Sequence, residues 1–312
     1  MTGTSEFSRI RKIIEQEQRS IGDRAEALVA EIRRKHSGKE RALLFYGSSL
    51  RAGEASGKML DFYVLVDSYR DVHGTGLKQL GSFLAPPSVH YCEADGPDGE
   101  RLRSKYSIVS LSAFRRRTRG GALESMLWAR FAQPTILICD DPDLREDLLD
   151  TLAHATHHFL AETAPLLRGE VAKGAIWERG LMESYKTELR PEDASGRSKQ
   201  IVAKYADRYE ALAGAMFPAG SNEALIEIPD ARSFGRNLCR LRWFTRRIVG
   251  KPMGAFRVMK AFFTFDAGLD YILEKIKSHS GAEIEVSDHA RKYPLLHAPI
   301  LAWRLFRKGA FR

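Results

Sequence analysis

Apolar residues recur at two different periods along the chain, and the change between them predicts an α+β fold. Ala25, Leu28, Val29 and Ile32 follow helical spacing within residues 5–36, and Gly22 indicates a break between two helices. Short apolar runs then predict strands at 41–46, 60–66, 89–92, 106–110 and 135–139. Gly, Pro and Asp residues in the segment 94–104 predict a loop between the third and fourth strands.

Helical patterns dominate after residue 112. Asp141 and Asp143 stand at the head of a predicted helix that runs to about residue 167, where a carboxylate can accept hydrogen bonds from exposed backbone N–H groups. Further helices are predicted over 173–218 and 232–277. We therefore predict a mixed domain over residues 1–145, a mostly helical domain over 146–280 and a basic amphipathic tail over 281–312.

The charge balance points to anionic partners. The 312 residues carry a formal net charge of +9 and a pI near 9.4, which suits nucleotides, nucleic acid or acidic lipid surfaces. No aromatic residues interleave with the basic runs as a base-stacking platform would, so we expect no nucleic-acid partner. Three widely spaced cysteines and the lack of a signal-peptide pattern predict a cytoplasmic protein.

A glycine and two serines follow the first predicted strand. Gly47, Ser48 and Ser49 predict a tight turn into a helix, whose backbone N–H groups and hydroxyls can hold phosphate oxygens. Asp61 stands fourteen residues after Gly47 and opens the apolar run FYVLV. In this spacing the chain resembles nucleotidyltransferases of the polymerase-β type, which have a mixed sheet and use paired carboxylates to hold Mg²⁺ against a nucleoside triphosphate. Met59 occupies the position of the first carboxylate in that pair.

A second metal ligand is therefore needed beside Asp61, because Mg²⁺ prefers near-octahedral oxygen ligation. Asp67 lies on the same side of the predicted strand as Asp61, but a straight strand separates the two by roughly 20 Å. Glu93, on the following strand, is the competing ligand.

The resemblance extends to one branch of these enzymes, the mitochondrial translocator assembly and maintenance family of phosphatidate cytidylyltransferases. The matching residues are Tyr46-Gly47-Ser48, Asp61-Phe62 with Val66-Asp67, His73, the strand Lys105 to Ser110, and the segment Trp128 to Pro134 with the strand that follows it. The similarity covers about two-thirds of the chain and weakens after about residue 220.

This resemblance implies the reaction of CTP with phosphatidate to give CDP-diacylglycerol and pyrophosphate, with Mg²⁺. It also implies that the middle domain is winged-helix-like and that residues 180–192 form a substrate-proximal loop, so that Lys186 and Arg190 are candidates for phosphate contacts. Lys105 is the predicted cation for the triphosphate. The predicted catalytic residues are Asp61 and Lys105, and the predicted nucleotide-binding residues are Gly47, Ser48, Ser49 and Lys105.

The last residues predict a helix with one apolar side and one basic side. Such a helix can lie in an anionic membrane interface with Trp303 at the boundary, although packing back on the protein is the alternative. The predicted membrane-binding residues are Leu301, Trp303, Arg304, Leu305, Phe306, Arg307 and Lys308. We therefore expect an enzyme that is peripheral on the inner face of a membrane.

Two other functions stay open at this point. The chain could transfer a nucleotide to another acceptor, such as a small alcohol, a protein or tRNA. It could also be a degenerate nucleotidyltransferase that serves as a membrane-binding or protein-binding scaffold, for which Met59 is the best argument. The sequence determines neither the base nor the oligomeric state.

Overall fold

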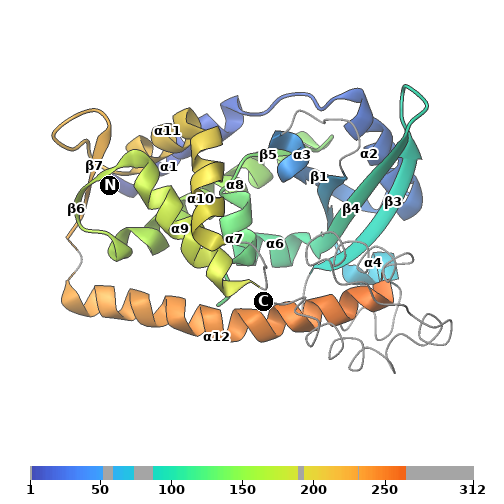
Figure 1. Ribbon diagram of the computed structural model, residues 1–312. Helices are drawn as coiled ribbons and strands as arrows, with labels where there is room; N and C mark the ends of the chain where they lie inside the picture. The colour runs from blue at the N-terminus through green and yellow to red at the C-terminus, as the bar shows by residue number, and fades with distance from the viewer. Residues whose placement is uncertain (1, 52–58, 74–86, 189–192, 231, 265–312) are drawn as a thin grey trace.

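A computed structural model of the chain describes residues 2–51, 59–73, 87–188, 193–230 and 232–264. One half of the molecule is built on a mixed five-stranded sheet with helices on both faces, and the other half is mostly helical, which confirms the predicted α+β class (Figure 1). The strand order is β3-β4-β2-β1-β5, with β2 and β4 parallel and the other neighbours antiparallel. The strands are β1 (Glu40–Tyr46), β2 (Leu60–Val66), β3 (Ser88–Asp95), β4 (Arg101–Ser110) and β5 (Thr135–Ile138).

The helices account for most of the remaining described residues. In the N-terminal half they are α1 (Thr2–Gln16), α2 (Asp23–His36), α3 (Ser48–Arg51), α4 (Tyr69–His73), α6 (Leu111–Thr118) and α7 (Met126–Phe131). In the C-terminal half they are α8 (Pro142–Thr163), the 3₁₀ turn η1 (Ala164–Leu166), α9 (Lys173–Thr187), α10 (Ala194–Lys204), α11 (Ala206–Met216) and α12 (Ser233–Thr264). A second sheet pairs β6 (Gly169–Ala172) with β7 (Leu225–Ile228).

The central strand β2 is buried on both faces, which explains its nearly continuous apolar sequence. Phe62 and Val64 pack toward α2, in a cluster that contains Leu28 and Ile32 of that helix. Tyr63 and Leu65 belong to the second, larger cluster. Asp61 is thus the one charged residue in a strand whose other side chains build two cores.

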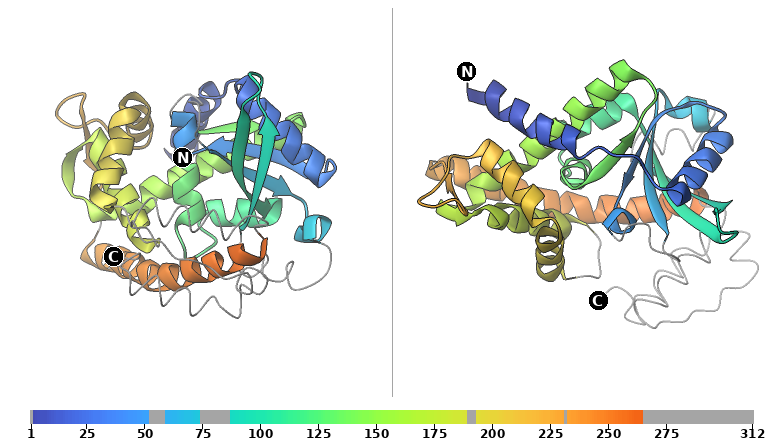
Figure 2. Two further views of the ribbon diagram at one scale, coloured as in Figure 1. Left: turned by 45° about the vertical axis from the view of Figure 1, so that its right-hand side comes forward. Right: turned by 90° about the horizontal axis from the view of Figure 1, so that it is seen from above.

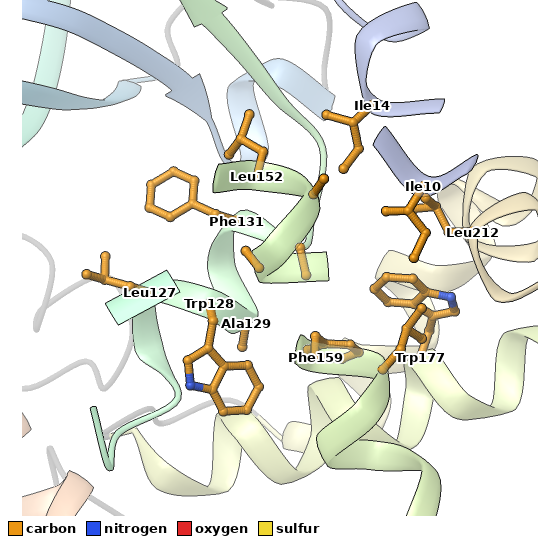
Figure 3. Close-up of a cluster of buried hydrophobic side chains, with 14 of the residues drawn as sticks. Ile10, Ile14, Leu127, Trp128, Ala129, Phe131, Leu152, Phe159, Trp177 and Leu212 are labelled. Carbon is orange, nitrogen blue, oxygen red and sulfur yellow. The ribbon is translucent and has the colours of Figure 1, made fainter. Parts of the chain in front are cut away.

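The larger core joins the sheet to the helical part of the molecule. It includes sheet residues such as Leu44, Tyr63 and Leu137 together with side chains of α1, α7, α8, α9 and α11, and Figure 3 shows how the helical members converge. The labelled members are Ile10, Ile14, Leu127, Trp128, Ala129, Phe131, Leu152, Phe159, Trp177 and Leu212. One continuous cluster therefore contains residues from both sides of the predicted boundary between residues 145 and 146. The boundary itself and the winged-helix-like character of the second domain stay predictions.

Most predicted elements are present, with two differences. The predicted loop 94–104 is wrong at both ends, because β3 continues to Asp95 and β4 begins at Arg101, leaving only a short turn between them. Cross-strand pairing continues up to the pair Asp95 and Arg101, so only residues 96–100 remain in the turn. The short strands β6 and β7 were also missed, since each has only four residues and little alternation.

The predicted head of α8 is confirmed. Asp141 is its N-cap residue, and its carboxylate accepts hydrogen bonds from the backbone N–H groups of Asp143 and Leu144. These bonds lower the pKa of Asp141, the bond from Leu144 most. None of the helices among the described residues combines the length and the apolar character that crossing a membrane requires.

The helix α12 lies along one side of the molecule. It passes from the β6–β7 sheet, beneath α9 and α7, to the neighbourhood of α4, and it is visible as a single long rod in both views of Figure 2. The predicted amphipathic tail, over 281–312, lies outside the described residues.

Candidate functional site

The candidate site begins where β1 ends. Gly47 follows Tyr46 with φ of +91°, and α3 starts at the next residue. A Cβ atom built on Gly47 would lie 3.0 Å from Asp61 Oδ2. Glycine is required here for two reasons, since other residues rarely adopt this φ and any side chain would press on the Asp61 carboxylate. The glycine that the sequence analysis singled out therefore holds the turn directly against the aspartate.

Asp61 and Lys105 are brought together by strand register. Tyr46 of β1 pairs with Asp61 of β2, which in turn pairs with Lys105 of β4, so the three side chains lie in one row across the sheet. Lys105 Nζ is 3.3 Å from Asp61 Oδ1, and the Asp61 and Lys105 side chains are 21% and 28% exposed. This places a carboxylate and an ammonium group at the start of β2, close to the Gly47 turn and open in part to a ligand.

The two serines of the turn open α3. The exposed Ser48 is its first residue and Ser49 its second. Their position beside Gly47 agrees with the predicted phosphate-binding turn, although the segment 52–58 that continues from α3 lies outside the described residues. A binding role for either hydroxyl stays a prediction.

The structure does not bring Asp67 to Asp61. Asp67 follows the opposite end of β2, where its carboxylate oxygen Oδ2 accepts a hydrogen bond of 2.9 Å from Arg41 Nη1. Six residues of extended chain correspond to roughly 20 Å. Arg41 also contacts Asp141, so Asp67 belongs to a surface ion-pair group at the far end of the strand.

Glu93 also lies away from Asp61. It is on the edge strand β3, opposite Arg103 of β4, and two strands from β2, which corresponds to roughly 10 Å across the sheet. Its carboxylate accepts hydrogen bonds from the Tyr91 hydroxyl at 2.6 Å and from Arg101 Nε at 2.8 Å. The hydrogen bond from Tyr91 lowers the pKa of Glu93 most, and the bond from Arg101 lowers it further. The negative charge of Glu93 is thus already compensated by a cationic neighbour.

These positions leave Asp61 as the one predicted metal ligand at the turn. The described part of the chain contains no group of three or more His, Cys, Asp or Glu side chains arranged to hold a metal ion. One carboxylate fits a single Mg²⁺ that arrives with a triphosphate, because Mg²⁺ is usually held by one or two carboxylates together with substrate phosphates and water. It does not fit a site that holds two metal ions on protein ligands alone.

The structure adds a residue that the sequence analysis did not select. Arg130 of α7 donates a hydrogen bond of 3.2 Å from Nη1 to the hydroxyl of Tyr46, the residue paired with Asp61. Its guanidinium lies 5.3 Å from the Tyr46 ring centroid and 5.9 Å from that of Tyr63, and Nη2 is 3.8 Å from Glu188 Oε2. A second cation thus lies one side chain away from the carboxylate.

Tyr63, one of the two rings beside Arg130, is fully buried. Burial raises the pKa of the Tyr63 hydroxyl to about 12, although the positive charge of Arg130 acts in the opposite direction. Arg130 could have been noticed from the sequence as the one charged residue in the otherwise apolar helix MLWARF. Nothing in that pattern, however, says that α7 packs over β1 and β2.

The remaining predicted site residues are distributed elsewhere. Lys186 lies on α9 with Nζ 3.5 Å from Glu183 Oε1, in a group of ion pairs that also includes Arg179 and Arg247. Arg190 and the predicted membrane-binding residues from Leu301 to Lys308 lie outside the described residues. The substrate-phosphate and membrane roles of these residues stay predictions.

Comparisons with known proteins add no family to this geometry. No protein-family model matches the chain, and no curated protein is similar to it at a significant level. The chemical function therefore has to be inferred from the residues that meet at the Gly47 turn.

Proposed function

We propose that the protein is a nucleotidyltransferase that transfers CMP from CTP to phosphatidate, giving CDP-diacylglycerol and pyrophosphate. The observation that carries the proposal is the convergence of Gly47, Asp61 and Lys105 at one end of the sheet, with 3.0 Å between a Gly47 Cβ position and Asp61 Oδ2 and 3.3 Å between Lys105 and Asp61. The choice of CTP and of a lipid acceptor is supported by the family resemblance of the motifs around these residues.

The chemistry requires charge compensation rather than a strong base. A phosphate oxygen of phosphatidate attacks the α-phosphorus of CTP, a new P–O bond forms, and the bond to the β-phosphate breaks to release pyrophosphate. The attacking group is an anion at neutral pH, so no side chain has to remove a proton. Catalysis then depends on cations that stabilise the charge in the transition state.

Each residue of the turn has a role in that scheme. The Gly47 backbone and the Ser48 hydroxyl would contact the triphosphate, because glycine at this position lets phosphate oxygens approach the chain. Asp61 would hold Mg²⁺, which when bound neutralises negative charge on the phosphates. Lys105 would leave its contact with Asp61 to contact phosphate oxygens, since the metal replaces it as the cation beside the carboxylate.

Arg130 would act indirectly in the free protein. Its bond to the Tyr46 hydroxyl fixes that ring next to Asp61, so Arg130 is a positioning residue for the carboxylate. It also keeps a positive charge near the site that supports the binding of an anionic ligand.

The test combines substrate screening with a pair of matched variants. Purified protein is incubated with Mg²⁺, each labelled nucleoside triphosphate in turn and vesicles that contain phosphatidate, and both labelled lipid and pyrophosphate are measured. Asp61→Asn is expected to reduce turnover by well over tenfold, where tenfold corresponds to about 1.4 kcal/mol in the barrier. Asp67→Asn removes the same charge at the opposite end of β2 and is expected to leave turnover within threefold.

Three results would contradict the proposal. Transfer of the label to an acceptor other than phosphatidate would show that the protein is a nucleotidyltransferase but that phosphatidate is not its substrate. Equal losses in the two variants would remove Asp61 from the reaction. If the protein shows no Mg²⁺-dependent binding of any nucleoside triphosphate, it would instead be a scaffold. Met59, in the position of a metal-binding carboxylate, is the sequence feature that favours this alternative.

A further inference from the structure

The long helix α12 presents an apolar stripe to the solvent. The stripe, which we call the outer face of α12, consists of Phe234, Leu238, Leu241, Phe244 and Ile248, with exposed fractions of 79%, 45%, 58%, 56% and 57%. Their spacing of three and four residues places them on one side of the helix. Leu123 is the only other large apolar residue that is exposed in the described part of the chain. Exposed apolar side chains are thus concentrated on one surface rather than scattered.

The opposite side of α12 is firmly packed, so the stripe faces outward by construction. Trp243 is buried and donates a hydrogen bond of 3.0 Å from Nε1 to the Glu162 carbonyl oxygen of α8. Arg246 is also buried, its guanidinium lies over the rings of Trp128 and Trp243, and it donates a hydrogen bond of 2.7 Å to the Glu162 carboxylate. Rotating the helix to bury the outer face would break these contacts.

The charge on α12 is of one sign. Between Ser233 and Thr264 the sequence has eight Arg and Lys residues and no Asp or Glu. Arg240 and Lys251 are exposed and flank the outer face on one side, and the half-exposed Arg242 flanks it on the other while contacting Glu162. An apolar stripe between basic flanks is the pattern of a helix that lies in the interface of an anionic membrane.

We propose that the outer face of α12 binds an anionic lipid surface, with its apolar side chains in the headgroup region and Arg240 and Lys251 on lipid phosphates. This inference rests on the proposed function in one respect, because an enzyme with a lipid acceptor has to contact a membrane. Vesicle binding itself needs no nucleotide and can be tested separately. In Figure 1, α12 extends along most of one side of the molecule, so its outer face is long.

Charge complementarity favours the lipid over a second copy of the chain and over the basic segment 299–312. A second copy of the chain would bring another α12 with eight basic and no acidic residues, so a symmetric contact through this face would set like charges against each other. The segment 299–312 of the same chain, PILAWRLFRKGAFR, is also basic and has no acidic residue to pair with Arg240 or Lys251. An anionic surface satisfies both flanks.

The experiment measures flotation of the full-length protein with phosphatidylcholine vesicles that do or do not contain phosphatidylglycerol, without nucleotide or Mg²⁺. Wild type is expected to float with the anionic vesicles only. Leu241→Gln with Phe244→Gln is expected to weaken that binding tenfold or more, because two exposed apolar side chains lose their place in the interface. Arg240→Gln with Lys251→Gln is expected to weaken it by a similar factor, and more at low than at high salt.

The matched control is Leu123→Gln, which removes an exposed leucine that is not on α12 and is expected to bind like wild type. All substituted residues are exposed, so unchanged thermal unfolding would show that the variants fold. Wild-type binding by the Leu241→Gln and Phe244→Gln variant would overturn the proposal, as would loss of binding only on deletion of residues 299–312. A variant that instead converts a dimer to a monomer in size-exclusion chromatography would assign the face to a second copy.

These results remain distinct from a failure of the proposed function. Turnover of CTP with a short-chain, water-soluble phosphatidate tests the chemistry without a membrane. If vesicle binding depends on the outer face but no cytidylyl transfer occurs, the lipid-binding proposal is supported and the proposed enzyme activity is refuted.

Discussion

Replacing Gly47 by alanine tests the site with the smallest possible change. Alanine adds one methyl group at a residue whose φ is +91°, and that group would lie 3.0 Å from Asp61 Oδ2. The left-handed backbone alone costs an alanine about 1–2 kcal/mol. With about 2–4 °C of melting temperature for each kcal/mol in a protein of this size class, we expect thermal unfolding to move down by about 2–8 °C.

The close contact adds a second effect that stability alone does not report. A Cβ at this distance obliges the carboxylate to move by a few tenths of an ångström, which shifts the atom that would hold Mg²⁺. Since misplacement by about 1 Å can cost a factor of about 100, we expect turnover to fall about tenfold, or about 1.4 kcal/mol in the barrier. Gly47→Val should be worse on both measures because of its larger side chain.

Gly99 provides the matched control. It has φ of +75°, and no atom lies within 4 Å of a Cβ built there. Gly99→Ala therefore carries the backbone cost without the contact to Asp61. Melting temperature by differential scanning calorimetry and turnover with CTP and phosphatidate vesicles are measured for both variants. If Gly47→Ala and Gly99→Ala lower turnover to the same extent, the Gly47 turn is structural only and the reasoning about its contact with Asp61 is refuted.

Two further predictions concern stability. Glu162→Ala is expected to lower the free energy of unfolding by about 3–5 kcal/mol, because it leaves the buried Arg246 without its carboxylate. Arg242→Ala removes the half-exposed partner of the same glutamate and should cost at most about 1 kcal/mol, and equal losses in urea unfolding would contradict this account. Burial lowers the pKa of His36 and of His158 below the unfolded value of 6.5. The unfolded state then takes up protons first, so stability should be complete above about pH 6.5 and fall as the pH drops, and a flat curve between about pH 7 and about pH 5 would contradict it.

The sequence by itself determined most of the helices and the five strands of the main sheet, but not all of their ends. Buried strands appear as continuous apolar runs because both faces of β2 are covered, and the head of α8 could be predicted because Asp141 caps backbone N–H groups within three residues of itself. These features depend on contacts that are close in sequence or on the periodicity of a single element. The spacing of Gly47 and Asp61 was noted from the sequence through a family resemblance, but that the two residues are in contact came from the antiparallel pairing of β1 with β2.

Only the tertiary structure decided which distant side chains share the site. The register of β2 and β4 sets Lys105 beside Asp61, and the packing of α7 over β1 brings Arg130 to Tyr46, but neither follows from a local pattern. Asp67 lies beyond the far end of β2, as the length of an extended strand predicted, and only the structure shows that Arg41 is its partner there.

Which side of α12 is buried was also decided only by the tertiary structure. Its sequence shows apolar and basic residues on all sides, and the pattern alone does not tell which apolar stripe is buried. The contacts of Trp243 and Arg246 with α8 orient the helix, and they leave Phe234, Leu241 and Ile248 in solvent. Orientation comes from pairing between elements far apart in the chain, because an amphipathic pattern fixes what a helix can bury but its neighbours fix what it does bury.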